Sequence, residues 1–87
     1  MNDDHIILGI HISDRLKNAV DVQKVFTAYG CNIKTRIGLH DVDERSCSPS
    51  GVVLIEFFGS EDEASAMMAK LNEVEGVGVQ KMVFHHE

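Results

Sequence analysis

The chain has 87 residues, 44% of them hydrophobic and 25% charged, proportions that fit one globular domain rather than a disordered segment. Its formal net charge is −6 and no basic run exceeds one residue, which argues against a nucleic-acid-binding surface and against attraction to an acidic membrane. The apolar run 6–12 is too short for a signal peptide or a membrane-spanning helix. We expect a single domain over residues 1–87 that stays in the cytoplasm.

The first third of the chain predicts a strand followed by a helix. Every second residue of His5–Ile12 is apolar, which predicts a strand with one buried face. Three-four spacing then predicts a helix from Asp14, which can cap it, to Tyr29, with Gly30 as a left-handed C-terminal residue. The apolar stripe expected to face the core comprises Leu16, Ala19, Val20, Phe26 and Tyr29, with Val22 and Val25 at its edge.

Two more strands and a polar connection between them follow. Residues 32–40 alternate in polarity, and this alternation places Lys34 and Arg36 on the face of the sheet away from the core. Residues 41–51 hold three acids, three serines and the only proline, which predicts a solvated connection of eleven residues. Val52–Phe58 is the third predicted strand.

The last third predicts a second helix and a fourth strand. Ser60 and Glu63 form a capping box, in which each side chain accepts a hydrogen bond from the other residue's backbone N–H. Apolar residues between 64 and 74 fall on one helical face, and Gly76 ends the segment. In the strand Val77–Phe84 we expect Lys81 at the rim of the core, and we expect residues 85–87 to be frayed.

This order of elements predicts an α+β fold, the ferredoxin-like βαββαβ sandwich, with a four-stranded antiparallel sheet and two helices on one face. The uncovered face would carry six apolar side chains: Ile7, Val52, Leu54, Phe58, Met82 and Phe84. Such a patch usually marks an interaction site, so we expect a homo-oligomer, a dimer or a tetramer.

Short motifs along nearly the whole chain carry a family resemblance. They are HIILGI at 5–10, SDR at 13–15, YGCNI at 29–33, RIGL at 36–39, VLI at 53–55, LN at 71–72 and GVGV at 76–79. In this order they resemble the ACT-like family of iron-only hydrogenase system regulators and, more distantly, ACT domains and the C-terminal domain of nickel-responsive repressors. The resemblance implies an oligomeric regulatory module that responds to a small ligand or a metal.

The cysteines give no reason to expect an enzyme. Cys31 would follow a helix C-terminus, where the helix dipole disfavours a thiolate, and Cys47 lies among acidic residues. We therefore expect a binding protein.

The candidate ligand site lies at the first strand–helix turn, at Ser13, Asp14 and Arg15, with Arg36 or His40 contributed from a second strand. Free backbone N–H groups at a helix N-terminus suit an anion, and arginine can hold a carboxylate or a phosphate with two hydrogen bonds. The resemblance to ACT domains implies a small-molecule effector at this turn, between subunits. The alternative is that Asp14 only caps the helix and both arginines are solvated.

Histidine and cysteine together suggest weak metal candidates. Zinc and nickel favour imidazole and thiolate ligands, and His11, His40 and Cys47 supply both without the short spacing of a strong metal motif. No cofactor can be named. Beside the regulatory ligand-binding module, two alternatives stay open: a structural oligomerisation domain without a ligand, and a nickel- or zinc-sensing module.

Overall fold

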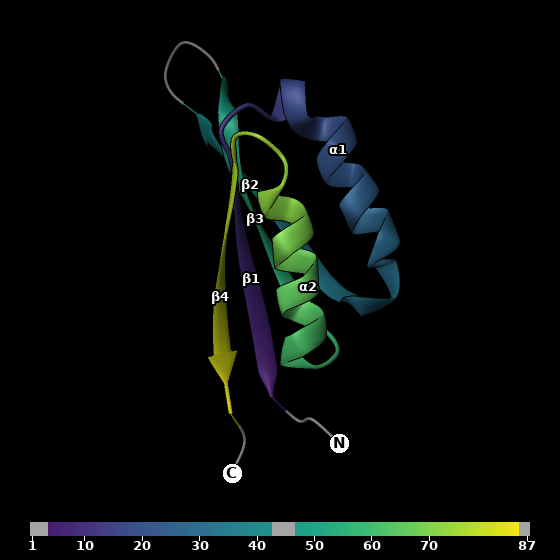
Figure 1. Cartoon of the computed structure of the whole chain (residues 1–87). Helices are drawn as coiled ribbons and strands as arrows, with labels where there is room; N and C mark the ends of the chain where they lie inside the picture. Colours follow the sequence, from purple (N-terminus) through teal and green to yellow (C-terminus); the bar gives the residue numbers. More distant parts are fainter. Residues whose placement is uncertain (1–3, 43–46, 86–87) are drawn as a thin grey trace.

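Both helices pack on one side of a four-stranded antiparallel sheet, whose strands run in the order β2-β3-β1-β4 (Figure 1). This computed structural model describes residues 4–42 and 47–85. The elements are β1 (His5–Ile12), α1 (Arg15–Ala28), the 3-10 turn η1 (Gly30–Asn32), β2 (Ile33–Val42), β3 (Cys47–Phe57), α2 (Glu61–Asn72) and β4 (Val77–Phe84). The predicted ferredoxin-like sandwich is confirmed. Within these residues, no helix has the length and apolar character needed to cross a membrane.

The core forms between β1 and the two helices, because β1 is a central strand with a fully apolar face. Ile6, Leu8 and Ile10 are completely buried, as the alternation predicts. The other buried apolar residues come from the end of β1 and from α1, β3, α2 and β4: Ile12, Val22, Phe26, Ile55, Phe57, Ala64, Met67, Leu71 and Val77. The helices therefore cover the side of the sheet that the sequence pattern assigns to the core.

Helix α1 is rotated relative to the predicted stripe. Val22 and Phe26 are buried, whereas the side chain of Val20 is 67% exposed, so the assignment of Val20 to the core is wrong. A residue turns about 100° around an α-helix, so Val20 lies roughly opposite Val22. Spacing by four from Asn18, which is also buried, gives the inward face correctly.

Helix α2 begins at the predicted capping box. The backbone N–H of Glu63 donates to the Ser60 hydroxyl (3.1 Å), and the backbone N–H of Ser60 donates to the Glu63 carboxylate (3.2 Å). The pKa of Glu63 is held below its ordinary value of 4.5, first by the bond from the Ser60 backbone, then by the Ser60 hydroxyl and by Asn32. Asn32 donates from its amide to the Glu63 carboxylate (3.3 Å) and to the carbonyl of Phe58 (2.9 Å), which ties η1 to the start of α2.

Two glycine expectations have different outcomes. Gly30 begins η1 and is not left-handed, so its predicted role as a left-handed cap is wrong. Gly76, after α2, has φ +82°. A Cβ atom on Gly76 would lie 2.6 Å from the hydroxyl oxygen of Ser13, so this turn needs glycine both for its backbone angle and for its close contact.

The hairpin between β2 and β3 is longer than the sequence predicts. β1 pairs with β3 as far as Gly51, whereas β2 and β3 stay paired as far as Val42 and Cys47. Figure 1 shows this hairpin reaching past the rest of the sheet. The eleven-residue connection predicted for 41–51 is therefore wrong. A two-stranded hairpin that no helix covers can be built from polar residues. Pro49 is tolerated in this part of β3 because the strand has a neighbouring strand on one side only.

A β-bulge near the start of β2 reverses the predicted faces of that strand. Ile33 pairs with Phe57, but Thr35 pairs with Glu56, so Lys34 is an extra residue of β2 in this pairing. After the bulge, Arg36 shares the helix-covered side with its partner Ile55, and Ile37 joins the open face, the sheet face without helices. The placement of Arg36 away from the core is thus wrong, because strict alternation does not survive an inserted residue.

Candidate functional site

A cavity of about 280 Å³ lies between α1 and the β2–β3 half of the sheet. Its walls come from β1, α1, β2 and β3, and they comprise Ile12, Ala19, Val22, Gln23, Phe26, Arg36, Gly38, Gly51, Val52 and Val53. Gly38 and Gly51 contribute no side chains at this place, which leaves room over the sheet. Gln23 and Arg36 are exposed, so the cavity meets solvent on their side.

Arg36 is the charged group of this cavity. Its guanidinium carbon lies 4.6 Å from the centre of the Phe26 ring, a cation–π contact that fixes the arginine against α1. In the part of the chain that the structure describes, Arg36 forms no ion pair with a carboxylate. The cavity therefore combines apolar walls with one cation that is held in place and still has its N–H donors available, a combination suited to a small anion with an apolar body.

Ser13 and Asp14 directly follow Ile12, which lines this cavity, but they are not among the lining residues themselves. The backbone N–H and the hydroxyl of Ser13 both donate to the carbonyl of Gly76, at 2.9 and 3.0 Å. Asp14 accepts from the backbone N–H of Lys17 at 3.1 Å and so caps α1. The side chains of Arg15 and His40 lie outside the described residues. The structure thus brings Arg36 and the end of β1 to one cavity, while Ser13 and Asp14 hold the neighbouring turns together.

The predicted metal candidates are placed only in part. His11 is exposed on the open face, where its cross-strand neighbours are Val52 and Gly78. The side chains of His40 and Cys47 lie outside the described residues, so this set stays a prediction. Sequence reasoning missed a different cluster, Asp4, Glu61 and His85, whose donor atoms all lie within 4.8 Å of one another. Its members are far apart in the chain, and only the pairing of β1 with β4 could have revealed them.

The open face carries part of the predicted apolar patch, since Ile7 and Val52 are half-buried. Leu54, Met82 and Phe84 are 36%, 55% and 54% exposed, and the bulge adds Ile37 at 52%. Ile37 pairs directly with Leu54 across β2 and β3. A sheet face that only contacts water is mostly polar, so four exposed apolar side chains on one face indicate an interaction surface.

Comparison with solved structures shows which other proteins share this fold. The uncharacterized protein TM1266 from Thermotoga maritima superposes with a TM-score of 0.78 at 23% identity, over 94% of this chain and 99% of that one. The ACT domain of GTP pyrophosphokinase from Chlorobium tepidum gives 0.61 at 21% identity, over 91% and 86%. CPII from Thiomonas intermedia K12, in a structure bound to ADP, AMP and acetate, gives 0.59 at 9% identity, over 97% and 89%.

At these identities the similarity establishes the fold, which is ACT-like. No protein-family model matches the chain, and comparison with curated proteins gives no match.

Proposed function

We propose that this protein is a regulatory module that binds a small anionic ligand in the cavity between α1 and the β2–β3 half of the sheet. The observation that carries the proposal is the position of Arg36, which places a positive charge at a cavity whose other described lining residues are apolar or glycine, apart from Gln23. The ligand would present a carboxylate or phosphate to Arg36 and an apolar group to Val22, Phe26 and Val53.

The size of the cavity limits the ligand. A volume of about 280 Å³ lies just below the roughly 300–1,000 Å³ typical of drug-sized ligands. Amino acids and other small carboxylates fit this limit, and a nucleotide would fit only with its base or its phosphates outside. The fold is compatible with such ligands, since CPII is similar in structure and its structure contains ADP, AMP and acetate.

The regulatory role has three supports. The ACT domain of a GTP pyrophosphokinase shares the fold, the motifs described above resemble regulators of iron-only hydrogenase systems, and the apolar open face suits a homo-oligomer. We therefore place the module in the regulation of such a hydrogenase system, with binding rather than catalysis as its activity. In the native host, deletion of the gene should change hydrogenase activity, and unchanged activity under hydrogenase-inducing conditions would contradict this setting.

The competing function is a structural oligomerisation domain without a ligand. It is favoured by the use of Ser13 and Asp14 in hydrogen bonds that hold the fold. The two functions differ in what they predict for Arg36. A ligand site needs the charge of Arg36 to hold an anion, whereas a structural domain needs this side chain only for its contact with Phe26.

A thermal-shift screen of amino acids, small carboxylates, nucleotides and divalent metals tests the proposal, because a ligand that binds only the folded state raises the melting temperature. Arg36→Met keeps the stem and removes the charge, and the anionic hit should no longer raise the melting temperature of this variant. Lys34→Met is the matched control, since Lys34 is on the same strand but lies near Glu56 instead (3.9 Å). Equal stabilisation of both variants would exclude the Arg36 site, and a screen without any anionic hit would favour the structural domain.

A further inference from the structure

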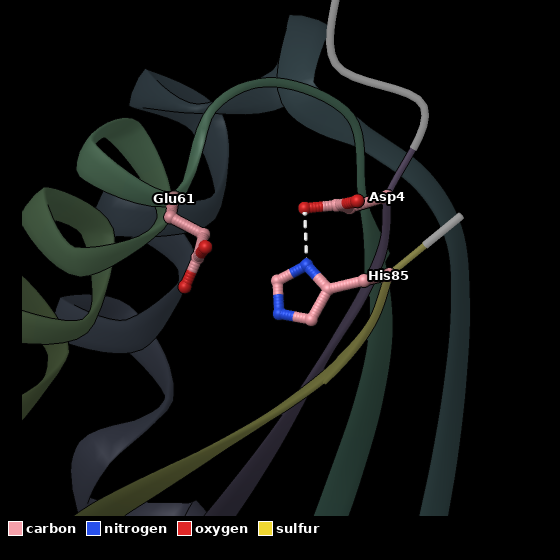
Figure 2. Close-up of side chains that lie close together, drawn as sticks. All are labelled: Asp4, Glu61 and His85. Atoms are coloured by element: carbon pink, nitrogen blue, oxygen red, sulfur yellow. Dashed lines mark hydrogen bonds and ion pairs between the residues drawn. The ribbon is translucent and has the colours of Figure 1, made fainter. Parts of the chain in front are cut away.

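We propose a second binding site, for a divalent transition-metal ion, formed by Asp4, Glu61 and His85. The three side chains come from the segment that leads into β1, the first residue of α2 and the residue that follows β4. Figure 2 shows them near one another, with the imidazole of His85 hydrogen-bonded to Asp4 and Glu61 beside this pair at the start of α2. They lie on a different side of the molecule from the cavity residues, so this site is independent of the proposed ligand site.

The spacing of the donor atoms fits an ion. His85 Nδ1 and Asp4 Oδ2 are 2.9 Å apart, and the donor atoms of all three residues lie within 4.8 Å of one another. Two ligands bound to one zinc ion at about 2.0–2.2 Å are about 2.9–3.4 Å apart for bond angles between octahedral and tetrahedral values. Asp4 and His85 are thus already at the distance of two ligands of one ion. Glu61 has a half-exposed side chain and needs only a rotamer change to approach them.

Burial and anchoring distinguish this cluster from a group of freely moving surface acids. The Asp4 side chain is only 18% exposed, and it contacts His85 across 81 positions of sequence. Glu61 is held by Lys81, whose ammonium lies 3.3 Å from its carboxylate. The pairing of β4 with β1 ends at His5 and Phe84, and the side chains of the next residues, Asp4 and His85, are in contact.

The local charge favours a cation. Two carboxylates and one ammonium give a formal charge of −1 with neutral imidazole. Asp62 and Glu63 in the first turn of α2 add negative charge and offset the positive end of that helix dipole. Lys81 opposes an incoming cation, but a carboxylate has two oxygens, so Glu61 can keep Lys81 on one and bind the ion with the other.

The donor set selects the class of ion. One imidazole and two carboxylates suit zinc and related first-row ions, whereas magnesium prefers oxygen ligands alone. Three protein ligands leave at least one coordination position for water or for a group from a partner. Since binding would join the start of β1, the start of α2 and the end of β4, it would also stabilise the folded state.

Calorimetric titration of the full chain with zinc tests the site. We expect one zinc ion per chain, magnesium not competing, and a higher melting temperature in zinc. Asp4→Asn and Glu61→Gln keep the side-chain shape and remove the charge of one ligand. Each should weaken zinc binding by about tenfold or more, because even the loss of a residue that only hydrogen-bonds to a metal ligand commonly weakens binding by this factor. Lys81→Met should strengthen binding, because it removes the opposing charge.

Two controls separate this site from other imidazole groups. His11→Ala, on the open face, and His86→Ala, next to the site in sequence, should both leave zinc affinity unchanged. The proposal is overturned if the wild type shows no saturable binding. It is also overturned if Asp4→Asn and Glu61→Gln, shown by circular dichroism to be folded, bind zinc as the wild type does. In that case, loss of binding in His86→Ala would identify simple chelation by neighbouring histidines.

Discussion

The guanidinium carbon of Arg36 lies 4.6 Å from the centre of the Phe26 ring, so a cation from β2 rests on an aromatic side chain of α1. This contact exists because the bulge at Lys34 turns Arg36 to the helix-covered side of the sheet. It holds the charged end of Arg36 against Phe26, which is another residue of the cavity lining. The bulge in β2 thus supplies the only charged group among the described residues that line the cavity.

The Arg36–Phe26 contact should be measurable as a coupling energy. In a double-mutant cycle with Arg36→Met and Phe26→Leu, we expect the two changes to be non-additive by about 0.5–1 kcal/mol in the free energy of unfolding, the range of an exposed cation–π pair. Urea denaturation of the four proteins gives this value. Additive effects would mean that the guanidinium does not interact with the ring in solution.

Gly76→Ala should destabilise the protein by about 1–3 kcal/mol, because a non-glycine residue is strained at positive φ and its Cβ would meet the Ser13 hydroxyl. Gly78→Ala is the matched control two residues later, since a Cβ there meets no atom within 4 Å. Thermal or urea unfolding compares the two. Similar stabilities for both variants would contradict the described turn between α2 and β4.

The capping box predicts a pH dependence of stability. The pKa of Glu63 is lowered in the folded protein by its bonds to Ser60. Its contribution to stability is therefore complete above the unfolded-state pKa and is lost as the pH falls through the lower folded-state value. In Glu63→Gln this side chain no longer titrates. The free energy of unfolding of the variant should therefore fall less steeply below the ordinary pKa of 4.5 than that of the wild type. Denaturation curves across this range check the difference, and parallel curves would show that the hydrogen bonds are absent in solution.

The open face predicts self-association. Ile37 and Met82 are more than half exposed on this face, so a second copy of the chain would remove apolar surface from water. Ile37→Glu or Met82→Glu should shift sedimentation velocity profiles towards the monomer. Val20→Glu places the same charge on an apolar site of α1 that is more exposed than either, and it should not shift the profile. A monomeric wild type at micromolar concentration, or dissociation by Val20→Glu alone, would contradict association through the sheet.

The sequence predicts the fold wherever a strong local pattern coincides with a buried face. The alternation of β1 and the capping box at Ser60 are both confirmed, because each depends on residues close in sequence. The rotation of α1 is predicted incorrectly because Val20 and Val22 are equally apolar, and only packing decides which of them is buried. The hairpin extends beyond its predicted ends because backbone pairing between two strands needs no apolar pattern.

The candidate site is less predictable than the fold. The sequence identifies Arg36 as a candidate, but its contact with Phe26 and its side of the sheet depend on the bulge at Lys34. A lysine at this position does not predict a bulge. The cluster of Asp4, Glu61 and His85 depends on strand pairing between the two ends of the chain. Local spacing rules cannot detect either arrangement.

The most direct test of the proposed ligand site is a two-dimensional NMR titration of isotope-labelled protein with the strongest anionic hit from the thermal-shift screen. We predict saturable shifts concentrated at the backbone amides around the cavity, above all those of Ile12, Phe26, Arg36 and Val53, and absent from the Arg36→Met variant. Shifts concentrated on the open face near Met82 and Phe84, or unchanged by loss of the arginine, would contradict the proposed function.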